Sequence, residues 1–389
     1  MAAGRRGNGE GSIYYSEKLN RWVGQFTAGV KTNGTPNRKS VYGKTRKEVA
    51  EKITKALNEI KEHSFVDKSD ITLEHLITEH IEDKYKANKV SAVTYLRDNE
   101  TLNIIKKMGS DLLSMKVQKI TYKELKHFFV CITAYSNSTI NKVYRLINVA
   151  FKKAVTQKLI HANPLDNKDE IIKPKSSKPD RAVEALTLDE QKKLINVLNN
   201  SETNHPYKNI IKLMIFTGMR IGEVLALTQE SIDDKYIHIK VSLTRDTNGN
   251  VMMGNTTKTY NSIRDIQIMS IVKNILDEVK KDYIDNPQHL LFYDKQNESI
   301  ITPSEVNSYL KRIANKYNIT TTIHNHMLRH TFATRCIESG MTAVVLAKKL
   351  GHKDVSITLN TYTSVFSKFE DTQDDRLIKY LETENLCWF

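Results

Sequence analysis

Aromatic and β-branched residues are concentrated in three short segments near the start of the chain, residues 12–17, 21–29 and 38–43. Each segment is bounded by turn-forming residues, which predicts three β-strands. Thr45 and Glu48 then form a capping-box pattern at the start of a helix that is expected to end near residue 62. The apolar positions of this helix recur at helical spacing and are Ala50, Ile53, Leu57 and Ile60.

The pattern from residue 70 to about residue 165 predicts helices throughout, with apolar stripes within residues 73–81, 91–106 and 139–157. The first stripe consists of Leu73, Leu76, Ile77, His80 and Ile81, and the third of Ile140, Val143, Leu146, Ile147, Ala150 and Ala154. The polar faces carry mostly basic residues, which are Lys84, Lys86, Lys89, Arg97, Lys106, Lys107, Lys142, Arg145, Lys152 and Lys153. A charged helix face can simply be solvated, but an excess of one sign also suits an acidic partner.

Residues 171–182 lack hydrophobic periodicity and contain two prolines, two serines and several basic residues, which is typical of an extended linker. After residue 183 the pattern predicts helices over 189–198, 207–218 and 221–227. Strands are expected over 236–243, 251–257 and 262–268, and helices again from residue 271. The chain is therefore expected to be a multidomain α+β protein. It would consist of a small three-stranded sheet plus helix, an all-helical domain, and a mainly helical domain with a small β-sheet.

Composition narrows the choice of partner. The 389 residues carry a formal net charge of +14, and residues 1–69 hold 14 Lys and Arg against 7 Asp and Glu. Such an excess favours a polyanion, most commonly nucleic acid, over a basic surface kept only for solubility. Three distant cysteines, Cys131, Cys336 and Cys387, give neither metal-ligand nor redox spacing and suggest a reducing compartment. The sequence has no eighteen-residue apolar run and no signal-peptide pattern, so we expect a cytoplasmic protein without a membrane span.

Familiar motifs for nucleotide, metal or disulfide chemistry are absent from the sequence: it has no phosphate loop, HExxH, CxxC or tight carboxylate cluster. If the protein cuts DNA, it is expected to do so without a metal. Phosphodiester exchange then needs a nucleophile, positive charge for the non-bridging oxygens, and a proton for the leaving oxygen. Tyrosine suits the role of nucleophile, because a phosphotyrosine ester conserves the energy of the broken bond for the reverse step. Arginine suits the neutralisation of the non-bridging oxygens, because its planar, permanently charged group matches two phosphate oxygens.

Four motifs supply these groups in order. Arg220 follows a glycine turn in TGMRIGEVLALT, with Glu223 three residues on to brace it. HMLRHTFAT, the second motif, places His326 and Arg329 on one helical face. The string LGHKDVSITLNTY contains the third and fourth motifs, which are Leu-Gly-His with His352 and the segment around Tyr362. Each motif taken singly is common on ordinary surfaces or in ordinary cores. Their order and spacing together resemble the tyrosine recombinase, or phage integrase, family.

The resemblance covers about residues 183–363 and implies a site. Its residues would be Arg220, Lys258, His326, Arg329, His352 and Tyr362, with Glu223 in support. Lys258 would be the hairpin lysine of the family, although Lys235, Lys240 and Arg264 lie in the same region. The sequence departs from many relatives in having His324 and Asn325 before His326, where Thr-Pro is frequent.

Family roles follow from the same resemblance. Arg220 and Arg329 would clamp the scissile phosphate, and His352 would add a hydrogen bond. Lys258 would protonate the leaving 5′ oxygen, and His326 would assist as an acid or base. Tyr362 would form the 3′-phosphotyrosyl bond, so that no cofactor is needed.

The rest of the chain is similar to integrases of temperate phages and conjugative transposons. The resemblance implies an arm-type DNA-binding domain (1–66), a core-binding domain (70–170), the linker (171–182), the catalytic domain (183–365) and a C-terminal tail (366–389). Double-stranded DNA would bind at core and arm sites, in a homotetramer that accessory excision or bending proteins could assist. The tail would dock on a neighbouring protomer or on its own domain. The arm contacts expected from the sheet are Tyr14, Arg21, Trp22, Gln25, Arg38 and Lys39, although Trp22 equally suits a small core.

Other functions share parts of this pattern. A dimer resolvase of chromosomes or plasmids is disfavoured by the basic N-terminal segment, and a type IB topoisomerase by the Leu-Gly-His string. A non-enzymatic DNA-binding descendant of a recombinase is disfavoured because all six catalytic positions are intact. The leading hypothesis is a site-specific recombinase of a mobile element that acts in integration and excision.

Overall fold

The computed structural model describes residues 11–30, 35–61, 69–166, 173–179, 184–200, 205–254, 263–367 and 370–384. It divides into two compact units, Met1–Asp180 and Arg181–Phe389, which are described separately below. No helix within the described residues is long and apolar enough to cross a bilayer. The two cysteines within these ranges, Cys131 and Cys336, are free thiols.

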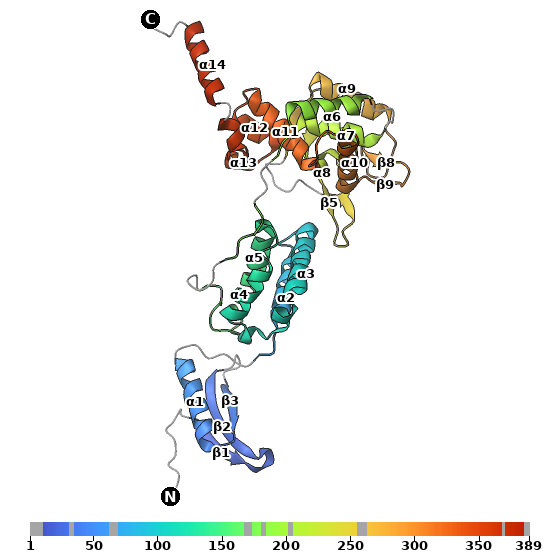
Figure 1. Ribbon diagram of the computed structural model, residues 1–389. Helices are drawn as coiled ribbons and strands as arrows, with labels where there is room; N and C mark the ends of the chain where they lie inside the picture. The colour runs from blue at the N-terminus through green and yellow to red at the C-terminus, as the bar shows by residue number, and fades with distance from the viewer. Residues whose placement is uncertain are drawn as a thin grey trace. The chain divides into compact units, whose positions relative to one another are not determined.

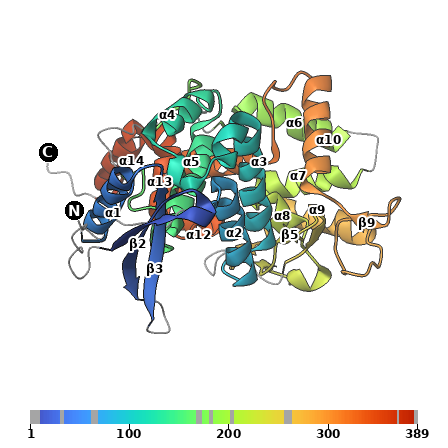
Figure 2. The same cartoon turned by 90° about the horizontal axis from the view of Figure 1, so that it is seen from below.

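A three-stranded antiparallel sheet begins the first unit, as its strand-forming segments between turn residues predicted. Its strands are β1 (Ser12–Ser16), β2 (Arg21–Val30) and β3 (Pro36–Gly43), in the order β1-β2-β3, with a short 3-10 helix at Glu17–Leu19. Strands β2 and β3 run side by side over most of their length (Figure 2). Helix α1 (Arg46–Lys61) covers one face of this sheet (Figure 1).

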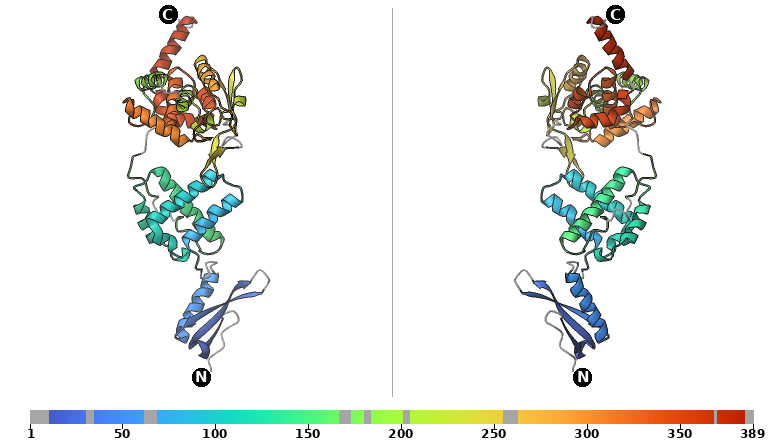
Figure 3. Two further views of the ribbon diagram at one scale, coloured as in Figure 1. Left: turned by 90° about the vertical axis from the view of Figure 1, so that its right-hand side faces the viewer. Right: turned by 90° about the vertical axis from the view of Figure 1, so that its left-hand side faces the viewer.

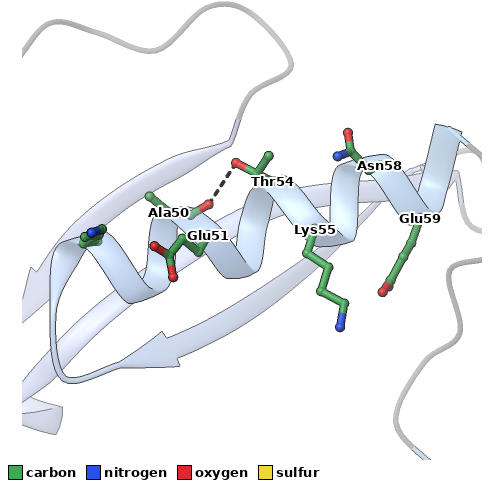
Figure 4. Close-up of a pocket in the computed structure, with 7 residues that line it drawn as sticks. Ala50, Glu51, Thr54, Lys55, Asn58 and Glu59 are labelled. Atoms are coloured by element: carbon green, nitrogen blue, oxygen red, sulfur yellow. Dashed lines mark hydrogen bonds between the residues drawn. The ribbon is translucent and has the colours of Figure 1, made fainter.

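The core between α1 and the sheet corrects one detail of the predicted stripe. Its buried residues are Phe26, Val49, Ile53 and Ala56, with Leu57 and Ile60 partly buried beside them. Ala50 instead lies on the outer side of α1, in a row of mostly polar residues (Figure 4). The stripe is displaced because 3.6 residues make one turn, so positions 49, 53 and 56 follow one face more closely than position 50 does.

The described residues after α1 in the first unit contain four α-helices: α2 (Leu73–Lys86), α3 (Ala92–Ser114), α4 (Tyr122–Cys131) and α5 (Asn137–Thr156). These helices, drawn in cyan to green in Figure 3, pack as a bundle around one apolar cluster. All the stripe positions predicted for α2 and α5 are buried except His80, which is partly exposed. Helix α3 extends beyond the predicted stripe of residues 91–106, with a kink at Gly109 where a Cβ would meet the Phe128 ring. A 3-10 helix, Val117–Lys119, leads into α4.

The second unit is mainly helical with small antiparallel strand pairs. Its helices are α6 (Leu188–Asn200), α7 (Pro206–Thr217), α8 (Ile221–Val224), α9 (Ser270–Lys281), α10 (Pro303–Lys316), α11 (Asn325–Glu338), α12 (Ala343–Leu350), α13 (Val355–Ser367) and α14 (Glu370–Thr383), with a 3-10 helix at Gln229–Ser231. Its strands are β4 (Tyr236–Ile239), β5 (Leu243–Arg245), β6 (Val251–Met253), β7 (Arg264–Gln267), β8 (Tyr293–Asp294) and β9 (Ser299–Ile300). Strand β4 pairs with β7, β5 with β6, and β8 with β9.

Two sequence predictions in this unit were too long. The strand expected over 236–243 is divided, because β4 and β5 belong to different pairs and the chain changes partner between them. The helix expected over 221–227 ends at Val224, and Leu225, Ala226 and Leu227 continue as buried non-helical chain. Both errors have one cause: apolar periodicity reports burial, but it does not report which neighbour satisfies the backbone.

Glycine turns end the helices that surround the candidate site. Gly218 follows α7 with φ at 66°, and a Cβ there would collide with the Phe332 ring of α11. Gly351 ends α12 with the same φ of 66°. Helices α11, α12 and α13 pack together (Figure 1), and an apolar cluster lies between them. These turns bring backbone carbonyls from two helix ends beside α11, which carries His326 and Arg329.

Candidate active site

Arg329 is the most deeply placed charged group of the site, with 2% of its surface exposed. Its Nη1 donates to the carbonyl oxygen of Gly218 at 2.8 Å, and its Nη2 donates to that of Leu350 at 2.5 Å. The guanidinium therefore joins the ends of α7 and α12. Among the described residues it forms no ion pair. Burial, reinforced by the charge of Arg220, lowers the pKa of Arg329 to about 9. A bound anion would relieve this cost, because an opposite charge favours the protonated arginine.

Arg220 lies beside Arg329 and is held by Glu223. Its backbone N–H donates to Glu223 Oε2 at 2.9 Å, and its Nη1 donates to Oε1 at 2.8 Å. Its Nη2 points to the carbonyl oxygen of Gly351 at 3.5 Å. The side chain remains 36% exposed, so the guanidinium is fixed on one side and open on the other. This is the arrangement expected of a phosphate-binding arginine.

Glu223 has a second partner that the sequence did not single out. Arg264 donates from Nη1 and Nη2 to the two carboxylate oxygens at 3.1 and 2.7 Å, and from Nε to the Lys349 carbonyl oxygen at 2.8 Å. Burial alone would raise the pKa of Glu223, but the Arg264 hydrogen bond and the charges of both arginines lower it to about 2. The carboxylate is thus a fixed anion that organises β7, α8 and the end of α12.

This pKa predicts an acid-sensitive contribution to stability. Relative to an ordinary value of 4.5, the lowered pKa of Glu223 corresponds to about 3 kcal/mol of stabilisation at neutral pH. Because the folded-state pKa is depressed, that contribution is present above pH 4.5 and is lost as the pH falls from 4.5 toward 2. Urea unfolding at pH 7 and pH 3.5 measures it.

The Glu223→Gln variant should be less stable at pH 7 by about 3 kcal/mol or more, since it leaves buried Arg264 without a carboxylate. It should also lose part of the acid dependence. Glu230→Gln, at an exposed position nearby, is the matched control and should change neither quantity. An unchanged acid dependence in the Glu223 variant would contradict the charged-carboxylate interpretation.

Two histidines, His326 and His352, are the next polar residues of the candidate site. His326 lies on α11 and is exposed, and its pKa is lowered by burial of part of the ring and by the charges of Arg329 and Arg220. His352 follows α12, and its Nδ1 lies 2.7 Å from the Thr358 hydroxyl. Burial and the same two arginines lower the pKa of His352 to about 4. His352 is therefore neutral at pH 7 and can donate one N–H hydrogen bond without adding charge.

Tyr362 is buried, with 2% of its surface exposed, among Ala333, Leu346 and Leu350. It stands at a kink in α13, where its φ and ψ of −118° and 18° interrupt the helix. Its hydroxyl lies 2.8 Å from Nδ1 of His330, a contact that motif reasoning missed. Burial raises the pKa of Tyr362 to about 12, although the charge of Arg329 acts in the opposite direction. The phenol is accordingly protonated at rest and needs a proton acceptor to act as a nucleophile.

Five of the six expected catalytic residues therefore come together from α7–α8, α11, α12 and α13. The sixth, Lys258, falls within residues 255–262 and lies outside the described residues. Arg264 and His330 are the additions. His330 follows Arg329 directly in the HMLRH string, and one helical turn separates it from His326, so helix geometry could have suggested that it faces the neighbouring helix. In the described part of the chain, no three His, Cys, Asp or Glu side chains gather in a way that could hold a metal ion.

The N-terminal sheet divides the six expected arm contacts between its two faces. A Cβ on Gly24 would meet Val49 and Ile53 of α1, so Trp22 and Phe26, two residues away on either side, share the helix-covered face. Lys39 is paired with Phe26 and belongs to that face too. The open face carries the remaining expected contacts, which are Tyr14, Arg21, Gln25 and Arg38.

The site in the second unit combines a tyrosine hydroxyl, a histidine in contact with it, and two arginines whose geometry suits phosphate oxygens. Such a combination defines a class of enzyme that attacks a phosphodiester with tyrosine. Comparisons with known proteins agree with this class. Residues 184–368 match the Phage integrase family, and residues 72–171 match the Phage integrase SAM-like domain.

Relatives extend the match over most of the chain. The tyrosine recombinase XerC-like protein of Caldanaerobacter subterraneus is 27% identical over 88% of this chain and 92% of its own length. The ICEBs1 integrase of Bacillus subtilis is 24% identical over 86% and 90%. Among solved structures, the Tn1549 transposon integrase bound to transposon right-end DNA superposes with a TM-score of 0.65 at 22% identity, covering 77% of this chain and 99% of that one. A lambda integrase tetramer on a Holliday junction gives 0.53 at 16% identity, covering 91% and 96%.

The chain belongs to the phage integrase family. It is a tyrosine site-specific recombinase of the kind carried by mobile elements.

Proposed function

We propose that this recombinase integrates and excises its element through a 3′-phosphotyrosyl intermediate on Tyr362. The observation that supports the proposal is that Arg329, whose charge acts on Tyr362, and Arg220 both point to carbonyl oxygens at the end of α12, directly before His352. The Tyr362 oxygen forms a bond to phosphorus while the bond from phosphorus to the 5′ oxygen breaks. The two arginines neutralise the non-bridging oxygens. Lys258 gives the leaving oxygen its proton, and rejoining reverses these steps.

The other polar groups have supporting roles in this proposal. His352 donates a hydrogen bond to the phosphate, and His326 orients it from the exposed side of α11. Glu223 holds Arg220 in place through the contacts described above. Because the phosphotyrosyl ester conserves the energy of the broken bond, the exchange needs no cofactor of high energy.

Covalent trapping tests this function. A duplex from the element end, nicked close to the crossover, loses its short leaving strand after cleavage and cannot be rejoined. The protein incubated with it should give a slow band on a denaturing gel, and proteolysis should place the DNA on the peptide that contains Tyr362. Tight binding of the duplex without any adduct at the cleaved strand would contradict the proposed chemistry.

Double-stranded DNA is the proposed partner at two sites. The helical domain and the catalytic domain would bind the core site, and the open face of the N-terminal sheet would bind an arm site. The arm proposal depends on Arg21, Arg38, Tyr14 and Gln25, which share that face, and Trp22 and Lys39 would act only through the fold. We also propose that the protein acts in the bacterial cytoplasm, where the host chromosome lies.

The arm proposal predicts a change in salt dependence. A protein with Arg21→Ala and Arg38→Ala should bind an arm-site duplex more weakly. If each arginine contacts a phosphate, the slope of log affinity against log salt should fall by about 2. The control removes the same charge from the outer face of α1 through Lys47→Ala and Lys55→Ala, two exposed positions. Lys55 is labelled in Figure 4. Fluorescence anisotropy at several salt concentrations measures both proteins, and equal slopes would place the arm site elsewhere.

The C-terminal helix fits an assembly of several copies. Within α14, Leu377, Ile378 and Tyr380 are 55%, 52% and 59% exposed. An exposed group of large apolar side chains often marks an interaction surface. We propose that this face docks on a neighbouring protomer of a homotetramer bound to DNA.

A further inference from the structure

One contact in the candidate site has no part in the reaction proposed so far. Nδ1 of His330 lies 2.8 Å from the Tyr362 hydroxyl, and the two rings meet edge-on with centroids 5.7 Å apart. Both side chains are largely enclosed: Tyr362 is buried and His330 is partly buried. Tyr362 belongs to α13 and His330 to α11, so this hydrogen bond joins two helices rather than neighbours in the chain.

His326, the histidine expected to act as acid or base, occupies a different position. Its ring stands edge-on to His330, with centroids 4.6 Å apart and an interplanar angle of 86°. His326 is exposed, whereas His330 is inserted between His326 and the tyrosine. The phenolic proton therefore has His330 as its immediate neighbour, and His326 is one ring further away.

The chemistry of the attack requires such a neighbour. The phenol carries its proton at neutral pH, and the oxygen becomes far more acidic as its bond to phosphorus forms. We infer that His330 is the catalytic base, whose Nδ1 accepts the phenolic proton of Tyr362 as the oxygen attacks phosphorus. Lys258 still protonates the departing 5′ oxygen. One proton therefore passes from Tyr362 to His330, and another passes from Lys258 to the leaving oxygen. This inference rests on the proposed role of Tyr362 as the nucleophile.

The surroundings of His330 agree with a base that is free to accept a proton. Burial and the groups facing the ring, which are His326, Arg329, His324 and His352, lower the pKa of His330 to about 4. The ring is therefore neutral at pH 7, and with its proton on Nε2 it presents the Nδ1 lone pair to the hydroxyl. A scissile phosphate held by the arginines adds negative charge close to the ring. That charge raises its basicity when DNA is bound.

The test separates proton acceptance from hydrogen bonding. Asparagine at position 330 can place an amide oxygen near the Nδ1 position and keep the hydrogen bond, but it cannot take a proton. The full-length His330→Asn protein is compared with the wild type on a nicked suicide duplex whose scissile bond contains a bridging 5′ sulfur. This leaving group departs without a proton, so the rate reports on the nucleophile alone. Adduct formation is followed from pH 6 to pH 9.

We expect a nearly flat pH profile for the wild type. The rate of His330→Asn should be about 10²- to 10³-fold lower at pH 7 and should rise about tenfold per pH unit, because hydroxide must then remove the proton. His326→Asn, the matched change one turn earlier, should lower the rate but keep the flat profile. A His330→Asn profile as flat as the wild type, with a rate within about threefold, would overturn the inference.

A second measurement distinguishes loss of the catalytic base from loss of the folded structure. The His330→Ala protein is assayed with and without added imidazole, which can occupy the space left by the ring. Imidazole should accelerate adduct formation at least tenfold in this variant and leave the wild type unchanged. No acceleration, in a variant that melts and binds DNA like the wild type, would count against His330 as the base. Failure of the wild type to form an adduct on Tyr362 would instead reject the nucleophile assignment.

Discussion

A Tyr362→Phe protein should form no covalent DNA adduct and perform no strand exchange, and its affinity for core-site DNA should be unchanged. The variant loses one oxygen and its hydrogen bond to His330. The ring keeps its packing against Ala333, Leu346 and Leu350, so the fold should persist. Removal of an attacking nucleophile commonly lowers the rate by about 10⁴-fold or more. The measurements are adduct yield on the nicked duplex and affinity by anisotropy.

The matched control is Tyr317→Phe, because Tyr317 is a 45% exposed tyrosine of the same unit. That protein should form adducts at the wild-type rate. An adduct in the Tyr362 variant would show that another side chain attacks phosphorus. A loss of DNA affinity would indicate that the hydroxyl stabilises the folded site, since the reaction itself contributes nothing to equilibrium binding before cleavage.

The sequence predicted much of the fold because most elements carry strong local signals. The strands of the N-terminal sheet follow from aromatic and β-branched residues between turns, helix α5 from its apolar stripe, and the start of α1 from its capping pattern. The elements whose limits were wrong, β4 and α8, are short, with four residues each. The residues at which these elements end depend on pairing between distant segments, such as β4 with β7. A local sequence pattern does not contain this information.

In the candidate site too, local sequence motifs identified some residues, and contacts between distant segments were needed to identify others. Arg220, Arg329, His352 and Tyr362 stand in recognisable strings, and the structure brings them together. His330 and Arg264 could not be selected in this way, because their importance lies in contacts across 32 and 41 residues of chain. Arg264 was considered only as a possible substitute for Lys258. Its observed partner is Glu223, which its guanidinium fork binds through both carboxylate oxygens.

The arm contacts illustrate a limit of strand patterns. Alternation shows which residues of a strand share a face, but it does not show which face the helix covers. Trp22 and Lys39 were grouped with Arg21 and Arg38, although neighbouring residues of a strand point to opposite sides. The decisive residue is Gly24, whose lack of a side chain allows α1 to approach.

Arg220→Ala should lower the rate of adduct formation by about 10²- to 10³-fold, because it removes a fixed donor from the phosphate in the transition state. Its effect on stability should be small, about 1 kcal/mol, since Glu223 keeps both hydrogen bonds from Arg264. Arg220→Lys keeps the charge but loses the planar fork that contacts Glu223 on one side and leaves further donors for phosphate. It should therefore recover about tenfold at most.

Single-turnover cleavage of the nicked duplex measures the rates, and urea unfolding measures stability. Lys273→Ala, which removes one exposed positive charge from α9, is the control for a general loss of charge and should react like the wild type. If Arg220→Lys cleaves at the wild-type rate, a point charge suffices at this position. The bracing of Arg220 by Glu223 would then serve only the fold, and the acid sensitivity predicted for Glu223 would concern stability without any consequence for catalysis.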